Sequence, residues 1–405
     1  MKFKRLLPSM ISTLFFVSVI ALSLAWNTSK PVIADKTTAV STEDSAEKVD
    51  NAEEMRGVWV TYMDLSMENE SEKSEKRFTE KFDEIAKNSK DFGFNTLIVQ
   101  VRPFCDALYE SEYFPYSHIL TGNQGENPEY DALEIMCEIC REYDLKIHAW
   151  INPYRVSVSK TPSELCESNP YEQNNKLGFE TESGIYLDPS STEAQSLIID
   201  GVEEIVSKYD VDGIQFDDYF YPNDVSDCDR DKYEAYSAQA SGECMSIDEW
   251  RCANVNMLIC NVYRKIHSTR SGVVFGISPQ GNLDNNANLY ADVKSWCICS
   301  GYVDYICPQI YFSLENPALS FESSLNAWKE LEFSKNVKLY IGLAGYKAGS
   351  ESDEGTWITN DDILAKEYEI ISNDSKASGF MLYSYSSLLN DDAGVEINNL
   401  KNQLN

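Results

Sequence analysis

Short apolar runs recur along this 405-residue chain and alternate with longer segments whose apolar residues fall on one helical face. Residues 96–101 read Thr-Leu-Ile-Val-Gln-Val. Such a nearly continuous apolar run is typical of a strand in a parallel sheet that is covered on both faces. Residues 72–89 instead carry apolar side chains at helical spacing, namely Phe78, Phe82, Ile85 and Ala86, which predicts an amphipathic helix.

The same alternation continues along the chain and predicts eight strands. We expect them at residues 56–61, 96–101, 146–151, 211–217, 273–277, 303–307, 337–342 and 379–385. We expect helices at residues 72–89, 131–143, 192–209, 248–267, 290–300, 320–332 and 361–373. Strict alternation implies parallel strands joined by right-handed crossovers. Eight such units over residues 55–405 favour an α/β fold, a (β/α)8 TIM-type barrel with long βα-loop insertions, over a doubly wound sheet.

The first residues follow a different pattern. Lys2, Lys4 and Arg5 precede an apolar run from about residue 10 to residue 26, which is the order of charges and apolar residues in an export signal. We predict that residues 1–26 are a signal peptide or an N-terminal membrane anchor. Residues 27–54 are too poor in large apolar side chains to fold, so we predict a disordered linker there. The chain is therefore expected to be exported to the cell envelope or beyond, with its folded domain at 55–405.

Composition excludes several classes of partner. The formal net charge of −32 argues against a nucleic-acid partner, which needs clustered Lys and Arg, and against binding to an anionic membrane surface. Membrane contact is expected only through the N-terminal segment. The chain has 11 Cys but only three His, and Cys137-x-x-Cys140 has no second pair to complete a zinc site. We expect the cysteines to be mostly small buried apolar residues and the protein to need no metal. No nucleotide-binding glycine motif follows the first strand, so no cofactor is expected.

The predicted fourth strand ends in two adjacent carboxylates, Asp217 and Asp218, which an aromatic loop follows at once. In a chain with 66 acidic residues this pair can be a solvated turn. In a barrel, however, the carboxyl ends of the strands face the active site. Two neighbouring carboxylates in an aromatic cleft repel one another and are partly desolvated. Their pKa values should therefore differ, which would provide one acid and one base.

Most other predicted strand ends are polar or aromatic as well. Hydroxyl groups of a sugar bind polar side chains and its C–H faces pack on aromatic rings, so these residues predict a carbohydrate cleft. The chain has no G-x-S-x-G nucleophile motif, which disfavours a serine hydrolase. The candidate substrate-binding residues are Arg102, Asn152, Tyr154, Arg155, Tyr219, Ser278, Gln280, Gln309, Tyr311 and Tyr385.

Seven segments of the chain carry motifs in a fixed order, namely 55–59, 95–102, 147–155, 187–189, 212–220, 276–279 and 308–311. They resemble the motifs of the glycosyl-hydrolase-like family 10 of bacterial exported proteins, and the motif at 212–220 is the most specific. The resemblance extends from about residue 55 to residue 390. It implies a TIM-type barrel, an envelope location, and hydrolysis of peptidoglycan glycan strands that lack stem peptides.

Two catalytic schemes are open from the sequence. In one, the 2-acetamido group of the sugar attacks the anomeric carbon, and one Asp of the pair orients this group while the other donates the proton. In the other, Asp217 works with a distant carboxylate, for which Asp188 is the candidate. A non-catalytic glycan-binding barrel and an amylase-like hydrolase of neutral glucans are the alternative functions.

Overall fold

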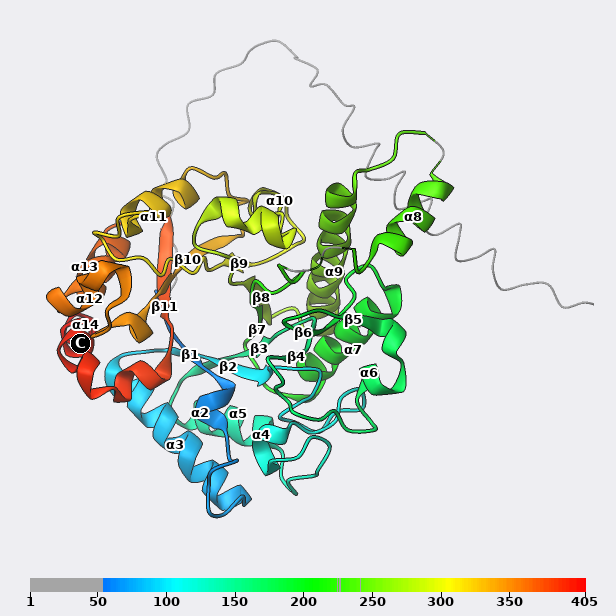
Figure 1. Ribbon diagram of the computed structural model, residues 1–405. Coiled ribbons are helices and arrows are strands. Elements are labelled where there is room, and N and C mark those ends of the chain that lie inside the picture. Colours follow the sequence, from blue (N-terminus) through cyan, green and yellow to red (C-terminus); the bar gives the residue numbers. More distant parts are fainter. Residues whose placement is uncertain (1–53, 224, 226, 241) are drawn as a thin grey trace, which may run out of the picture. The chain divides into compact units, whose positions relative to one another are not determined.

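The computed structural model describes residues 54–223, 225, 227–240 and 242–405, which form a closed barrel (Figure 1). Its strands are all parallel and lie in the order β1-β11-β10-β9-β8-β7-β3-β2. This confirms the predicted TIM-type α/β fold. The predicted segments 1–26 and 27–54 lie outside the described residues, apart from Glu54. The barrel strands are β1 (Met55–Val60), β2 (Thr96–Arg102), β3 (Lys146–Ile151), β7 (Gly213–Phe216), β8 (Val274–Ile277), β9 (Tyr305–Ile306), β10 (Lys338–Leu343) and β11 (Ala377–Leu382).

Helices surround these strands as a ring in Figure 1. The first of them begins after Ser74, whose side chain accepts a hydrogen bond from the N–H of Arg77, and ends at Gly93, which adopts a φ of 111°. No helix in the described part of the chain is long and apolar enough to cross a membrane. The ring consists of α3 (Glu75–Phe92), α5 (Ala132–Glu142), α7 (Thr192–Lys208), α9 (Ile247–Thr269), α10 (Val293–Ile298), α11 (Phe321–Lys329), α13 (Ile363–Ser372) and α14 (Gly394–Leu404).

The strands separate two apolar layers. Outward side chains pack against the helices, whereas inward side chains fill the barrel itself. Gly276 of β8 illustrates how full the interior is, because a Cβ atom there would lie 2.0 Å from the ring of Tyr305. His148 of β3 is also inside, where its Nδ1 lies 2.9 Å from the hydroxyl of Tyr305 and burial lowers its pKa to about 3. The inward cluster contains Met55, Trp59, Ile98, Trp150, Tyr305, Cys307, Tyr340 and Met381.

Two long insertions follow the third and fourth barrel strands, and both contain elements that the sequence pattern did not predict. After β3, the strands β4 (Arg155–Val158), β5 (Gly178–Glu180) and β6 (Gly184–Leu187) form a small antiparallel sheet in the order β4-β6-β5. After β7, helix α8 (Arg230–Gln239) precedes α9. The base of α8 is held by a buried ion pair, in which the guanidinium of Arg251 on α9 bonds the carboxylate of Asp229.

Candidate active site

Asp217 follows directly on β7 and shares its inward face. Side chains alternate along this strand, so that Phe216 packs outward while Gln215 and Asp217 point into the barrel and its mouth. β7 pairs with β3 in a register that opposes Phe216 to Ile151, and this brings Asn152, the residue directly after β3, beside Asp217. Asn152 Nδ2 donates a hydrogen bond to Asp217 Oδ2. The backbone register of two adjacent strands therefore forms this contact.

Asp218 is bound by side chains that come from the ends of the next two strands. Gln309, beyond β9, donates from Nε2 to Asp218 Oδ1 at 2.9 Å and to the carbonyl oxygen of Ser278 at 2.8 Å. Gln280, beyond β8, donates from Nε2 to Asp218 Oδ2. Both oxygens of this carboxyl group thus accept an amide hydrogen bond. Asp217 and Asp218 are only 5% and 1% exposed, which excludes the interpretation of the pair as a solvated turn.

The two carboxyl groups have different surroundings. Burial raises the pKa of Asp217 from 3.8 to about 7; the guanidinium of Arg155 opposes this rise and the charge of Asp218 adds to it. Burial also raises the pKa of Asp218, but the amides of Gln280 and Gln309 favour its charged form. Asp217 accepts one side-chain amide bond and Asp218 accepts two, so near neutral pH we expect Asp217 to hold a proton more readily.

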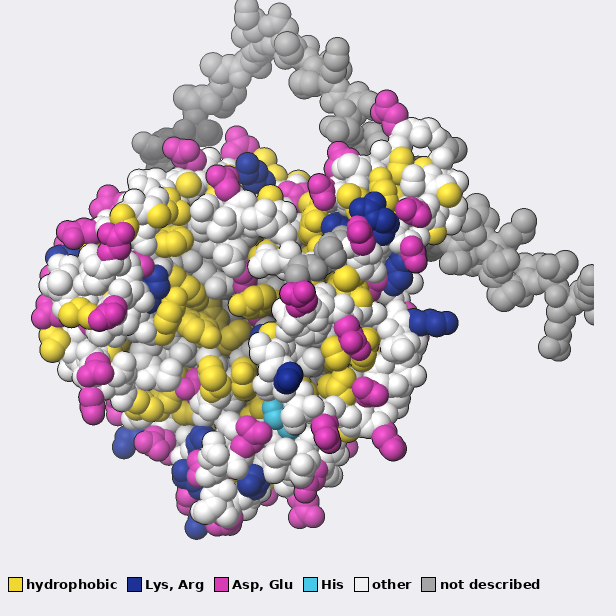
Figure 2. Space-filling view, viewed as in Figure 1, with side chains coloured by type: hydrophobic (Ala, Val, Ile, Leu, Met, Phe, Trp, Pro, Cys, Tyr) yellow, Lys and Arg dark blue, Asp and Glu magenta, His cyan; other side chains and the backbone are white. Residues whose placement is uncertain are grey.

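An aromatic wall borders the pair, and its residues lie in or just beyond β1, β3, β9, β10 and β11. We define it as Trp59, Trp150, Tyr311, Tyr346 and Tyr383. Tyr383, directly after β11, is at its centre, with ring centroids 5.9 Å from Trp59, 6.5 Å from Trp150, 5.8 Å from Tyr311 and 5.9 Å from Tyr346. Figure 2 shows apolar side chains around a hollow near the centre of this face, with acidic side chains toward its edge. Flat rings next to buried carboxyl groups form a surface that suits a sugar ring.

Two wall residues have further contacts that matter for chemistry. The charge of Asp217 is among the causes, after burial and the charge of Asp64, that raise the pKa of Tyr383 to about 12, so this hydroxyl stays protonated beside the pair. The indole Nε1 of Trp150 is buried without a hydrogen-bond partner among the described residues, yet it is near enough to Asp217 to favour the charged carboxylate. Both groups are therefore donors close to the carboxyl group of Asp217.

Arg155 and Tyr219 form a second border of the site. The guanidinium of Arg155 lies 5.6 Å from the ring centre of Tyr219 and 5.2 Å from that of Phe104, and its Nε donates to the carbonyl oxygen of Pro103 at 2.8 Å. Tyr219 is 52% exposed, which is unusual for a large aromatic residue in this protein. An exposed ring held by a cation beside the buried pair is available to contact a ligand.

The expectation that all the candidate strand-end residues converge in one cleft is wrong for Arg102, Tyr154 and Tyr385. The register of β2 against β3 shifts between Gln100 and Arg102, which turns Arg102 outward. Its guanidinium lies 4.0 Å from the ring centre of Phe114, in the layer between strands and helices. Tyr154 is fully buried in the same outer layer, and Tyr385 accepts a hydrogen bond from Asn88 of α3 at 3.0 Å.

Asp188 follows β6 in the small antiparallel sheet, and its carboxylate has other partners. It accepts hydrogen bonds from the N–H and hydroxyl of Ser190 at 2.8 and 2.6 Å, and it forms an ion pair with Lys232 of α8. In the part of the chain that the structure describes, its side-chain bonds join the two insertions and do not reach Asp217. This arrangement favours a structural role for Asp188.

Sequence reasoning missed several residues of the site. Gln100 of β2 donates from Nε2 to Asn152 Oδ1 at 2.7 Å and is thereby connected to Asp217 through Asn152. Its signal was present, since it is the polar residue near the end of an apolar strand. Trp150 and Tyr383 lie within the predicted strands 146–151 and 379–385 and were not named as site residues. Tyr346, which is 48% exposed, follows β10, and its sequence context gave no signal.

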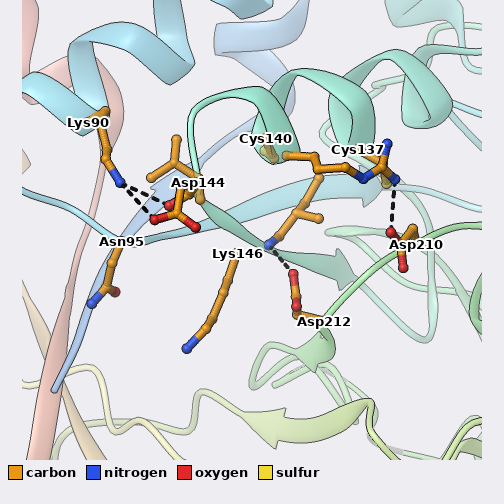
Figure 3. A pocket seen from close by; sticks show the side chains of 11 residues that line it. Lys90, Asn95, Cys137, Cys140, Asp144, Lys146, Asp210 and Asp212 are labelled. Atoms are coloured by element: carbon orange, nitrogen blue, oxygen red, sulfur yellow. Dashed lines mark hydrogen bonds and ion pairs between the residues drawn. The ribbon is translucent and has the colours of Figure 1, made fainter. Parts of the chain in front are cut away.

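A separate polar pocket of about 330 Å³ lies at the opposite, amino-terminal end of the strands (Figure 3). Asn95, Lys146 and Asp212 line it beside the first residues of β2, β3 and β7. Cys137 and Cys140 of α5 form part of its wall, and burial raises the pKa of both thiols, that of Cys137 to about 12. These thiols are unreactive packing groups, and this end of a barrel contributes stability rather than chemistry.

Comparison with known proteins identifies the family. The sequence matches glycosyl hydrolase-like 10 over residues 54–359, which is most of the described domain. The chain belongs to this family. Glycosyl hydrolase DigH of Escherichia coli (strain K12) is 32% identical over 374 residues, covering 82% of this chain and 83% of that protein. Glycosyl hydrolase YngK of Bacillus subtilis (strain 168) is 34% identical over 321 residues, covering 74% of this chain. The chain spans 62% of the length of YngK.

Solved structures support the fold of this glycosyl hydrolase-like 10 protein. The PgaB (BpsB) glycoside hydrolase domain from Bordetella bronchiseptica superposes with a TM-score of 0.57 at 12% identity, covering 85% of this chain and 98% of that one. Alpha-L-fucosidase isoenzyme 2 from Paenibacillus thiaminolyticus gives a TM-score of 0.55 at 14% identity, covering 87% of this chain and 49% of that one. At these identities the likeness concerns the barrel and not the substrate.

Proposed function

We propose that the protein is an exported glycoside hydrolase that cleaves peptidoglycan glycan strands poor in stem peptides. One observation carries the proposal. Two buried carboxyl groups lie side by side at the mouth of a barrel, in unequal hydrogen-bond surroundings and beside an aromatic wall. Membership of a family whose relatives are described as glycosyl hydrolases supports the reaction class.

The unequal surroundings suggest a role for each carboxyl group. A general acid must hold a proton near the working pH, and a pKa of about 7 gives Asp217 that property. Asp218 accepts amide hydrogen bonds on both oxygens and keeps its charge more easily. In our proposal Asp217 protonates the leaving glycosidic oxygen, and Asp218 supplies the negative charge that stabilises the positive charge developing on the sugar.

The 2-acetamido group of the substrate supplies the nucleophile in this scheme. Its carbonyl oxygen attacks the anomeric carbon while the bond to the leaving oxygen breaks, and Asp218 orients the acetamide N–H. The proton that Asp217 gave leaves on the hydroxyl of the departing sugar. Water then opens the cyclic intermediate at the anomeric carbon, and Asp217 accepts a proton from this water and so regains its acid form. The sugars of peptidoglycan carry this acetamide group, so the substrate and an adjacent carboxylate pair are consistent with each other. The scheme needs no further carboxylate and leaves Asp188 to its bonds with Lys232 and Ser190.

Aryl glycosides test which carboxyl group donates the proton. An acidic phenol leaves without protonation, so Asp217→Asn should lose much less activity on an activated aryl N-acetylglucosaminide than on glycan strands. Asp218→Asn should lose activity on both substrates, because the acetamide is no longer oriented. The reverse pattern would contradict the assignment and exchange the two roles.

A substrate panel tests the function itself. Release of reducing ends is measured with denuded peptidoglycan strands, chitin oligomers and starch at equal sugar concentration. We expect activity on the acetamido polymers, with peptidoglycan preferred, and none on starch. Binding without release would favour a glycan-binding scaffold, and activity on starch would favour an amylase-like hydrolase. Recovery of the protein from the cell envelope or the medium, but not from cytosol, tests the export that residues 1–26 predict.

A further inference from the structure

The side-chain amide that bonds Asp217 is held by a chain of hydrogen bonds that starts at a backbone N–H group. The N–H of Tyr62, the first residue of α2 (Tyr62–Leu65), donates to Gln100 Oε1 at 3.0 Å. Gln100 Nε2 donates to Asn152 Oδ1 at 2.7 Å, and Asn152 Nδ2 donates to Asp217 Oδ2. Three segments, from the ends of β1, β2 and β3, are thereby connected to the carboxyl group beyond β7.

The backbone N–H of Tyr62 determines the direction of every hydrogen bond in this series. A backbone N–H can only donate, so Gln100 must turn its oxygen toward Tyr62 and its NH₂ group toward Asn152. Asn152 must then turn its own oxygen toward Gln100 and its NH₂ group toward Asp217. Gln100, Asn152 and Asp217 are 2%, 1% and 5% exposed, so water does not readily replace any of these bonds. The geometry requires that Asp217 receives a donor and not an acceptor.

We propose that Gln100 is a positioning residue that acts through Asn152, because it holds the Asn152 amide with its N–H directed at the carboxyl group of Asp217. This inference deepens the proposed function and rests on it in one respect, namely that Asp217 is the proton donor. Gln100 does not touch Asp217 in the described hydrogen bonds, so its effect must pass through Asn152.

Gln215 provides a matched control. Like Gln100, it is a buried glutamine inside the barrel, and it lies on β7 two residues before Asp217. Its Oε1 accepts from Trp59 Nε1 at 2.6 Å and its Nε2 lies 3.4 Å from Met381 Sδ, so these contacts do not involve Asn152 or Asp217. Replacing either glutamine by Met removes an amide of similar length from the same barrel interior, but only one of them is connected to Asp217.

The test measures the proton affinity of Asp217 directly and needs no substrate. The full chain is labelled with [4-¹³C]aspartate, and the carboxyl signal of Asp217 is identified by its absence in Asp217→Asn. Its titration midpoint is then compared between variants. We expect Gln100→Met to raise the midpoint by about one unit, because the donor to the charged carboxylate is no longer fixed. Gln100→Glu should raise it at least as much, since Asn152 would donate to the new carboxylate and turn its oxygen toward Asp217.

Two comparisons separate this role from a general effect on folding. In an Asn152→Leu background, Gln100→Met should give no further shift, because the connecting amide is gone. Gln215→Met should leave the midpoint of Asp217 unchanged. An unchanged midpoint in both Gln100 variants would overturn the inference, as would an equal shift in the Asn152→Leu background. Loss of folding in both Gln100 variants while Gln215→Met folds would also overturn it, by showing a structural role.

The proposed function fails separately. Suppose that the wild-type chain released no reducing ends from any acetamido polymer, but that the Gln100 variants shifted the titration midpoint of Asp217 as expected. Hydrolysis would then be refuted, and the role of Gln100 in orienting Asn152 would stand. If hydrolysis occurred and the midpoints did not move, the inference about Gln100 alone would be refuted. A pH–rate profile of Gln100→Met, with its alkaline limb displaced upward, would connect the two results.

Discussion

Replacing Asp217 by Asn should stabilise the fold, and the size of the effect should depend on pH. The carboxyl group is 5% exposed, and its pKa rises from 3.8 to about 7 on folding. As pH rises, the unfolded chain loses this proton first, so the folded state binds more protons between these two values and the free energy of unfolding falls. Above pH 7 the charged group destabilises the fold by up to about 4 kcal/mol, since one unit of pKa corresponds to about 1.4 kcal/mol.

Urea unfolding at two pH values measures this effect. At pH 8.5, Asp217→Asn should raise the free energy of unfolding by up to about 4 kcal/mol. At pH 5.5 it should raise it by about 2 kcal/mol, because the folded protein there holds the proton almost completely and only the unfolded chain is ionised. The lower pH of 5.5 is about one unit above the pI of 4.4, so the protein keeps a net negative charge that favours solubility. The difference of about 2 kcal/mol between the two conditions is the quantity to compare.

Asp353 provides a control of opposite sign. Burial opposes its ionisation, but hydrogen bonds from Lys347 and from the N–H of Ser313 prevail and lower its pKa to about 2. Its charged form therefore stabilises the fold at every pH well above 4, and Asp353→Asn should cost about 2 kcal/mol at both pH 5.5 and pH 8.5. An equal effect of Asp217→Asn at both pH values, or a loss of stability at pH 8.5, would refute the account of the buried pair.

Three further substitutions test other parts of the structure. Gly276→Ala should lower the free energy of unfolding by about 1–3 kcal/mol in urea, because the new Cβ meets the ring of Tyr305; an unchanged value would show that the barrel interior has room. Arg251→Met should cost about 3–5 kcal/mol by leaving the buried Asp229 without its partner, and a neutral effect would contradict the buried pair. Tyr219→Ala should raise KM for glycan oligomers about fivefold, the value of one stacked ring, with unfolding unchanged; an equal KM would remove Tyr219 from the cleft.

The fold could be predicted because its signal is repeated. Each barrel strand is a short apolar run, each major helix has one apolar face, and eight repetitions leave few other architectures. The positions of Asp217 and Asn152 could also be predicted from the sequence. Both residues directly follow apolar strands, and the alternation of side chains along these strands determines which residues point inward. The small sheet β4-β6-β5 and helix α8 could not be predicted from the sequence. The structure of an insertion depends on contacts between residues that are far apart in the sequence, such as the ion pair of Lys232 with Asp188.

The errors at the site have two physical causes. A single shift of register turns a strand residue to the other face, and the shift between Gln100 and Arg102 turned Arg102 outward while Gln100 kept the inward position that alternation predicts. Tyr383 and Trp150 were not predicted as site residues, because aromatic side chains within strands usually belong to the core. In this barrel, however, the upper layer of the interior is also the floor of the cleft. Which layer faces a ligand depends on the length of each strand, and the sequence does not specify this length to a single residue.

The release of reducing ends from denuded peptidoglycan strands tests the central claim most directly. The wild-type chain is compared with Asp217→Asn and Asp218→Asn, and each variant is shown to fold by its urea transition. We predict that the wild-type chain cleaves the strands and that each variant loses at least about a hundredfold in rate, the usual effect of removing a group that transfers a proton or stabilises charge. Cleavage at the wild-type rate by both variants would contradict the claim that this pair performs the reaction.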